Sequence, residues 1–236
     1  MELLLLSNST NAGEVFLEYA MPQIQKFLGK EQKNCVFIPY AAVAIGYDEY
    51  ETKVAEKFSE AGYILKSVHN YSYPAQAIKN ADAIIVGGGN TFHLLHQMQK
   101  NDLLNAIRER VAEGIPYIGW SAGSNVACPG LYTSNDMPII GPKSFEALNL
   151  VTFQINPHYL DANPDGHAGE TREARIEEFL IVHPNVYVVG LREGTMLKIS
   201  GNKITLIGAR KARIFKSGME PLELGTRDNF EFLLAD

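Results

Sequence analysis

Short, continuous apolar runs alternate along the chain with longer segments in which apolar residues recur every three or four positions. Four runs have the length and character of strands buried on both faces, at residues 3–6, 35–38, 83–86 and 115–118. Between them, residues 47–61 place Val54, Phe58 and Ala61 at helical spacing. This alternation predicts an α/β fold of three αβα layers, with a mostly parallel, doubly wound sheet whose sites lie at the carboxyl ends of the strands.

Two further parts of the pattern complete the expected fold. Residues 14–28 predict a helix that is kinked or split at Pro22, and residues 170–182 predict another helix. Beyond residue 196, short apolar segments alternate with glycine turns, which predicts short antiparallel strands near the C-terminus. Because no repeat, linker or low-complexity segment interrupts the pattern, we expect residues 1–236 to form a single domain.

The composition argues against two classes of partner. The chain has 236 residues, of which 46% are hydrophobic and 20% charged, as is ordinary for a globular protein. Its net charge of −6 comes without any cluster of lysine and arginine, so we expect neither nucleic acid nor an anionic membrane as a partner. An acidic substrate would have to be held by one or two placed cations.

The cysteines and the N-terminus bear on location. Cys35 and Cys128 are the two cysteines, and they fall in an expected strand and an expected helix, which favours buried free thiols in a reducing compartment. The apolar run at residues 3–6 is too short for a signal peptide or a membrane span. We therefore predict a cytoplasmic protein.

The strand expected at residues 115–118 leads directly into a G-x-S-x-G sequence, which is typical of a nucleophile elbow. In such a turn Ser121 projects at the carboxyl end of the sheet, and Gly119 and Gly123 avoid collisions of a Cβ with neighbouring backbone. The Ala122 N–H and the start of the next helix would then face the charge that develops on an attacked carbonyl. The motif alone equally allows a glycine-rich turn with an incidental serine.

A second glycine-rich turn follows the strand expected at residues 83–86. Gly87, Gly88 and Gly89 precede Asn90, and their N–H groups are free of shielding side chains. They could cradle a phosphate or supply a second oxyanion donor. Because no P-loop lysine follows and the spacing is not G-x-G-x-x-G, we favour the oxyanion role.

Of the six histidines, His158 is the best candidate for the base that a serine nucleophile needs, because it directly follows an expected strand, as Ser121 does, and we expect it near the same edge of the sheet. His69 also follows a strand but has no acid or glycine near it in sequence. His93 and His96 lie one helical turn apart, yet no neighbouring Glu or Cys completes a metal site, so we predict no metal and no cofactor. The other two, His167 and His183, are expected in loops.

Two carboxylates compete to orient the imidazole of such a base. Glu193 ends an expected strand, whereas Asp136 lies in a polar loop and could instead bind a substrate amine. Glu193 could also simply pair with Arg192.

Arg172 falls in the first turn of a helix, where a cation opposes the helix dipole. Its charge is either offset by neighbouring glutamates or forms an anion-binding fork at the cleft.

Taken together, these segments resemble the peptidase E family of serine peptidases over nearly the whole chain. The matching runs are MELLLLSNST, VGGGNTF, YIGWSAGSN, NDMPI, INPHY and GHAGETRE, followed by Glu193-Gly194. The resemblance implies hydrolysis of dipeptides with an N-terminal aspartate, on a fold like that of class I glutamine amidotransferase domains. One departure is Arg192, which stands where we expect the family to have proline before its glutamate.

Carried over by position, the resemblance implies a triad of Ser121, His158 and Glu193, with Asp136 as an alternative third member. The implied oxyanion donors are Gly88 or Gly89 together with Ala122. Candidates for substrate binding are Arg172, Asp136 and Asn90.

We thus expect a serine exopeptidase for Asp-X dipeptides, whose partner is a small acidic dipeptide. The alternatives are another serine hydrolase on this scaffold, such as a cyanophycinase-like peptidase or an esterase, and a non-catalytic binding module. The sequence leaves open whether the chain is a monomer or a homodimer.

Overall fold

The computed structural model describes residues 1–163, 165–166 and 168–234, and its larger sheet has seven strands. In spatial order these are β3 (Ile64–Ser67), β2 (Asn34–Ile38), β4 (Ala83–Val86), β5 (Tyr117–Trp120), β1 (Glu2–Leu6), β8 (Met196–Ser200) and β9 (Lys203–Ile207). The first five are parallel to one another, and β8 and β9 add to β1 as antiparallel strands. The mostly parallel sheet and the antiparallel strands near the C-terminus are therefore confirmed.

Helices cover both faces of this sheet, as the alternation of strand and helix predicts. One face carries α1 (Met21–Leu28) and α2 (Tyr47–Glu60), and the other carries α3 (Pro74–Lys79), α4 (Thr91–Lys100) and α5 (Leu103–Ala112). Because side chains alternate along a strand, Leu4 and Leu6 of β1 pack into the core under α1 and α2, while Leu3 and Leu5 pack under α3 to α5. No helix in the described part of the chain is long and apolar enough to cross a membrane.

The helix expected at residues 14–28 is shorter than its apolar pattern suggests. Residues 14–20 form turns, with Leu17 at φ 58°, and α1 begins only at Met21. A helix starting at residue 14 would place Pro22 in its interior, where proline lacks the N–H needed for the carbonyl of Glu18 and its ring collides with the preceding turn. In the first turn of α1 the missing N–H costs nothing.

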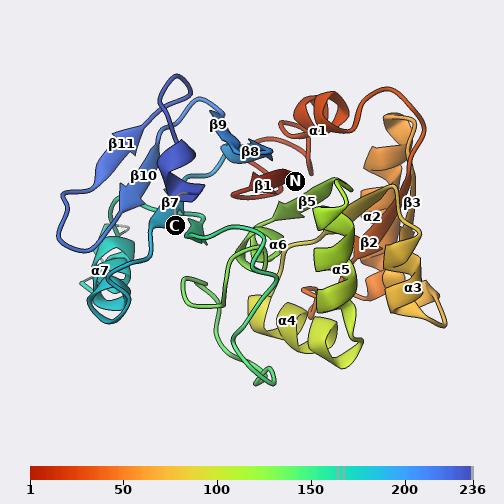
Figure 1. The fold of residues 1–236 in the computed structure, drawn as a ribbon, viewed down its shortest axis with the longest axis horizontal. Helices are drawn as coiled ribbons and strands as arrows, with labels where there is room; N and C mark the ends of the chain where they lie inside the picture. The colour runs from red at the N-terminus through yellow and green to blue at the C-terminus, as the bar shows by residue number, and fades with distance from the viewer. Residues whose placement is uncertain (164, 167, 235–236) are drawn as a thin grey trace.

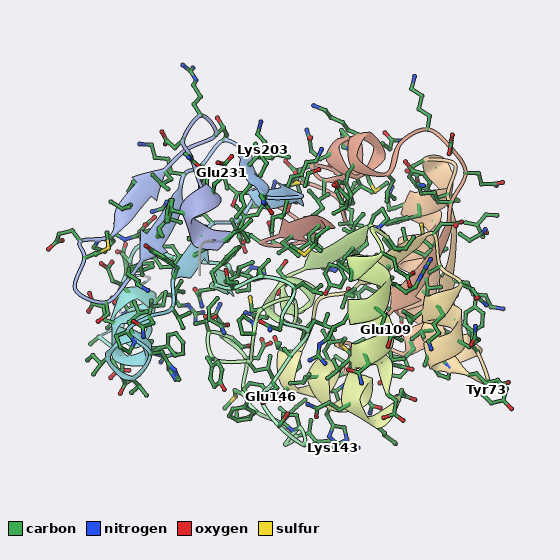
Figure 2. All side chains as sticks on the ribbon, in the orientation of Figure 1. Tyr73, Glu109, Lys143, Glu146, Lys203 and Glu231 are labelled. Atoms are coloured by element: carbon green, nitrogen blue, oxygen red, sulfur yellow. The ribbon has the colours of Figure 1, made fainter. Side chains whose placement is uncertain are left out.

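A separate four-stranded sheet forms the other end of the molecule (Figure 1). Its order is β11 (Leu222–Leu224), β10 (Ala212–Phe215), β7 (Val188–Leu191) and β6 (Gln154–Pro157), and it is accompanied by α7 (Arg172–Val182) and η2 (Glu231–Leu234). Its two neighbouring strands β6 and β7 are parallel, whereas the other pairs are antiparallel. In Figure 2, Glu231 lies beside this sheet, and Tyr73 lies at the opposite end of the protein.

Buried side-chain hydrogen bonds fix the two sheets to each other. The hydroxyl of Ser7, directly after β1, is fully buried; it donates to the Leu191 carbonyl at 2.7 Å and accepts the His158 N–H at 2.9 Å. In the short helix α6 (Ala122–Asn125), Asn125 Nδ2 donates to the Ile155 carbonyl at 2.6 Å. These bonds hold the carboxyl ends of β6 and β7 against the carboxyl ends of β1 and β5.

Arg192, which follows β7, forms an ion-pair network with Asp161 and with Glu223 on β11. Its guanidinium donates two bonds of 2.8 Å to Glu223 and also bonds both carboxylate oxygens of Asp161, one from Nε at 3.0 Å. These bonds hold the pKa of Asp161 and of Glu223 below their ordinary values. Arg192 is thus paired with Asp161, three residues after His158, and with Glu223 on β11. These pairs anchor the chain segment that follows His158.

We expect Arg192→Met to destabilise the protein at neutral pH and to do so less in acid. Removing the arginine should cost on the order of 1–3 kcal/mol, between the values for exposed and for buried pairs. Because the carboxylate pKa values are lowered in the folded state, the network stabilises the native protein above the pKa values of the unfolded chain, and this contribution disappears as the pH falls through the folded values.

Urea unfolding of both proteins at several pH values between 7 and 3 measures this effect. The difference in unfolding free energy should be largest at pH 7 and shrink toward pH 3. A difference that stays constant across this range would show that the arginine acts by packing alone.

Candidate active site

Ser121 lies in a strained turn between β5 and α6. Its backbone has φ 52° and ψ −111°, a conformation that residues other than glycine rarely adopt. The flanking glycines are needed for close backbone approach: a Cβ on Gly119 would lie 2.4 Å from the Gly123 oxygen, and one on Gly123 would lie 2.3 Å from the Val86 oxygen. The turn therefore has the geometry of a nucleophile elbow.

A chain of two hydrogen bonds runs from Ser121 through His158 to Glu193. His158 Nε2 lies 3.0 Å from Ser121 Oγ, and His158 Nδ1 lies 2.6 Å from Glu193 Oε1. With a neutral imidazole, Nδ1–H donates to the carboxylate and Nε2 accepts from the serine hydroxyl. About two fifths of each of the His158 and Glu193 side chains is exposed, so the group opens to solvent.

The two sheets contribute different members of this chain. Ser121 follows β5 in the seven-stranded sheet, whereas His158 and Glu193 follow β6 and β7 in the four-stranded sheet. Because β6 and β7 are parallel neighbours, with Pro157 paired to Leu191, the residues after them emerge side by side. Sequence reasoning placed His158 at the edge of the same sheet as Ser121, and this expectation was wrong.

Asp136 lies elsewhere, at the start of α4. Its Oδ2 accepts hydrogen bonds from the Thr91 N–H at 2.7 Å, from Thr91 Oγ1 at 2.5 Å and from Ser134 Oγ at 3.2 Å. A carboxylate in this position stabilises the N-terminus of a helix. Of the two acids that the sequence left open, Glu193 is the one in contact with His158.

The structure separates Gly88 from Gly89, the two glycines that the sequence offered as alternative oxyanion donors after β4. The Gly88 N–H donates to Tyr50 Oη at 3.0 Å, and Trp120 Nε1 donates to the same oxygen at 2.9 Å. The N–H groups of Gly89 and Ala122 have no acceptor in the described part of the chain. This arrangement favours Gly89 over Gly88 as a partner of Ala122 in an oxyanion hole.

Tyr50 is a residue of this site that sequence reasoning missed. Burial raises its pKa to about 12, so the hydroxyl stays neutral and can also donate to the Gly88 carbonyl, 3.2 Å away. In the sequence it is one of several apolar or aromatic residues on a helix, and no local signal connects it with a loop 38 residues later. Gly89 itself has φ 138°, and a Cβ there would lie 2.2 Å from the Ala41 oxygen.

A cavity of about 600 Å³ opens beside Ser121 and His158. This volume is within the usual range of small-molecule sites. Asn90 lies on its wall and also caps α4, because its Oδ1 accepts the His93 N–H at 3.0 Å and its Nδ2 donates to the Met137 carbonyl at 2.9 Å. The structure thus brings Asn90 to the cavity that contains Ser121.

Arg172, the first residue of α7, lines a different and much smaller cavity of about 60 Å³. Burial and the neighbouring Arg175 lower its pKa, while Asp136 acts in the opposite direction. The nearby glutamates do not offset it: Glu170 pairs with Arg175, and Glu173 pairs with Arg213. Arg172 therefore has no carboxylate partner among the described residues.

The remaining histidines are tied to other groups. His93 Nδ1 lies 2.6 Å from the Tyr40 carbonyl oxygen, and His96 Nδ1 lies 3.1 Å from that of Gly141. His183 stacks on Phe179, with ring centroids 4.5 Å apart. His167 lies outside the described residues.

His69 has an acidic neighbour that the sequence did not reveal. Its Nε2 lies 2.8 Å from Asp48 Oδ1, and ligand atoms of Asp48, Glu51 and His69 all lie within 4.8 Å of one another. Glu51 is already bonded to the Ser67 N–H and to Asn70, however. The group joins α2 to the 3₁₀ helix η1 (Val68–Asn70), away from Ser121.

Known proteins resemble this chain over nearly its full length. A peptidase E of Nostoc sp. (strain PCC 7120) is 55% identical over 232 residues, which cover 98% of this chain and 96% of that protein. A peptidase E of Escherichia coli O6:K15:H31 is 48% identical over 229 residues, which cover 96% and 100%. The crystal structure of a peptidase from an acI-B1 actinobacterium has the same fold, with a TM-score of 0.68 and 19% identity over 97% of this chain and 96% of that one.

The model of peptidase family S51 matches residues 3–207. The matched region includes all three residues of the chain from Ser121 to Glu193, and the resemblance inferred from the sequence motifs is confirmed. This protein belongs to peptidase family S51.

Proposed function

We propose that this S51 peptidase is a serine exopeptidase that hydrolyses dipeptides with an N-terminal aspartate. The observation that carries the proposal is the hydrogen-bonded chain from Ser121 Oγ through His158 to Glu193, at 3.0 and 2.6 Å, on a strained elbow. The relatives named peptidase E, at 48% and 55% identity over nearly the whole chain, support the choice of substrate.

In the proposed reaction Ser121 Oγ attacks the peptide carbonyl while His158 Nε2 takes its proton. The N–H groups of Gly89 and Ala122 would receive the negative charge that forms on the carbonyl oxygen. His158 then gives the proton to the leaving amine, the C–N bond breaks, and an acyl-enzyme remains on Ser121. A water molecule, deprotonated by the same imidazole, then attacks the acyl carbon; the ester C–O bond breaks, the imidazolium returns its proton to Ser121 Oγ, and aspartate leaves. Glu193 stabilises the imidazolium in both steps. No step calls for a metal or a cofactor.

Arg172 is our candidate for binding the side-chain carboxylate of the aspartate. It lines a cavity with Asn135, its pKa responds to the charge of Asp136, and no carboxylate in the described part of the chain forms an ion pair with it. The substrate amine could meet the Oδ1 atom of Asp136, the oxygen that the helix cap does not use, and Asn90 faces the cavity beside Ser121.

We also propose a cytoplasmic location for the peptidase. Its support is the state of the cysteines: both are free and buried, and burial raises the pKa of Cys35 and of Cys128 to about 12. Such thiols remain protonated and suit a reducing compartment.

A substrate panel with the native enzyme and Ser121→Ala tests the proposed function. We expect hydrolysis of Asp-Leu, and a loss of at least about 10³-fold in kcat on removal of the nucleophile, together with loss of labelling by a fluorophosphonate. Glu-Leu, β-Asp-Leu and p-nitrophenyl acetate complete the panel. Preferential cleavage of β-Asp-Leu or of the acetate would indicate a cyanophycinase-like peptidase or an esterase, and an unlabelled Ser121 would indicate a binding module.

The two acids are separated by a matched pair of isosteric substitutions. Glu193→Gln should lower kcat by about 10²–10⁴-fold, because the amide cannot stabilise the imidazolium that forms on His158. Asp136→Asn should change kcat only a few-fold, since an amide oxygen still accepts from Thr91. Steady-state kinetics with Asp-Leu measure both effects, with circular dichroism to confirm folding. A larger loss of kcat in the Asp136 variant would reverse the assignment.

Arg172→Met tests the aspartate site. Losing charge-assisted bonds to a carboxylate should lower kcat/KM for Asp-Leu by roughly 100-fold. Cleavage of Asn-Leu, which lacks that charge and which we expect to be slower in the native enzyme, should be affected little. Arg175→Met is the control, because Arg175 lies one turn further along α7 and already pairs with Glu170. Unchanged kcat/KM for Asp-Leu in the Arg172 variant would exclude this role. If only Arg175→Met lowers kcat/KM for Asp-Leu, Arg175 binds the aspartate carboxylate instead.

A further inference from the structure

The wall of the cavity beside Ser121 includes a lysine side chain, Lys53, that has no role in the proposed reaction. Lys53, on α2, lines the same cavity as Ser121 and His158. Its Nζ lies 4.4 Å from the centre of the Phe16 ring, a cation–π contact that holds the ammonium group at the wall of the cavity. No ion pair links Lys53 to a carboxylate in the described part of the chain, whereas Lys57, one turn further along α2, pairs with Glu60 at 3.0 Å.

The wall around Lys53 is apolar and open. It includes Phe16, Val43, Ile45 and Ile139, and Val43 and Ile139 have more than half of their surface exposed. Trp120 forms the base of this side, with its ring centre 6.2 Å from that of Phe16. Apolar side chains that gather around a polar reaction centre and remain exposed are typical of a surface that a ligand covers.

Lys53 and Arg172 lie on the sides of two opposite faces of the large sheet. Lys53 and Trp120 belong to the layer of α1 and α2. Arg172 lies against residues 132–135, and Ser134 of that segment bonds Thr91 at the start of α4, on the other face. Ser121 follows a strand in the middle of the sheet, between these two layers.

A dipeptide Asp-X also carries two carboxylates, one on each side of the bond to be cut. The first is the aspartyl side chain, and the second is the terminal carboxylate of the leaving residue. With Arg172 assigned to the first, Lys53 has the charge that the second requires and lines the cavity in which the leaving residue would lie.

We propose that Lys53 binds the terminal carboxylate of the leaving residue, and that the apolar wall of Phe16, Val43, Ile45 and Ile139 receives its side chain. This inference rests on the proposed dipeptidase function and names the part of the site that selects substrate length. In a longer peptide a neutral amide would replace the carboxylate opposite Lys53, so the ammonium group would gain no partner. The site therefore favours dipeptides whose second residue is apolar.

Lys53→Met tests the inference, with Asp-Leu and Asp-Leu amide as a matched pair of substrates. We expect the native enzyme to prefer the free acid by about 10-fold in kcat/KM, the effect of one charge-assisted bond at a partly exposed site. The substitution should slow the acid by that factor, leave the amide unchanged and bring the ratio close to one. Lys57→Met is the control, because it removes the same charge from the same helix outside the cavity, and it should keep the native ratio.

Each outcome has one meaning, because fluorophosphonate labelling of Ser121 confirms in every variant that the centre is folded. If the native enzyme cleaves Asp-Leu but Lys53→Met keeps the native ratio, or if Lys57→Met lowers it equally, the role of Lys53 is refuted and the dipeptidase function stands. If the native enzyme cleaves neither Asp-Leu nor its amide, the proposed function fails and the inference fails with it.

Discussion

One buried hydroxyl, that of Ser7, holds together the place where the two sheets meet. It donates to the carbonyl of Leu191, the last residue of β7, and accepts the N–H of His158, the first residue after β6. The Ser7 hydroxyl and the Leu191 carbonyl are buried, and leaving a buried polar group unpaired costs about 1–3 kcal/mol. The separation of His158 from Ser121 is therefore set by a hydrogen-bonded joint and not by the flexibility of a loop.

The reactive geometry also depends on strain that the surroundings enforce. Ser121 and His158 both have φ near 52°, in the region that non-glycine residues avoid. Such conformations typically cost about 1–3 kcal/mol and persist where neighbouring structure over-determines them. Here the backbone packs so closely at Gly119 and Gly123 that a Cβ at either would collide with a neighbouring carbonyl oxygen, and a hydrogen bond to Ser7 holds the His158 backbone. Two side chains from different sheets thus point at each other because their backbones have little freedom.

Electrostatics act locally in this protein. The net charge of −6 repels acidic molecules at long range, so recognition of an acidic peptide must come from individual cations close to the reaction centre. Arg192, next to Glu193, cannot serve, because Asp161 and Glu223 already hold its guanidinium. Arg172 and Lys53 have no such partners among the described residues: Lys53 lines the cavity that contains Ser121, and Arg172 lines the smaller cavity beside Asn135.

The sequence by itself determined the features that depend on local pattern: the buried strands of the parallel sheet, the elbow around Ser121, the glycine-rich turn after β4, and the candidates His158, Glu193 and Asp136. Tertiary structure decided how these parts combine. In the folded protein β6 and β7 belong to the second, four-stranded sheet, and Glu193, not Asp136, contacts His158. The Gly88 N–H donates to the hydroxyl of Tyr50. The expected helix at residues 14–28 is confined to Met21–Leu28. The physical reason is that apolar periodicity and turn residues act within a few positions. The pairing of β6 with β7, the bond between His158 and Glu193 and the bond between Gly88 and Tyr50 instead join residues 34 to 38 positions apart, and only the packed core fixes their relative position.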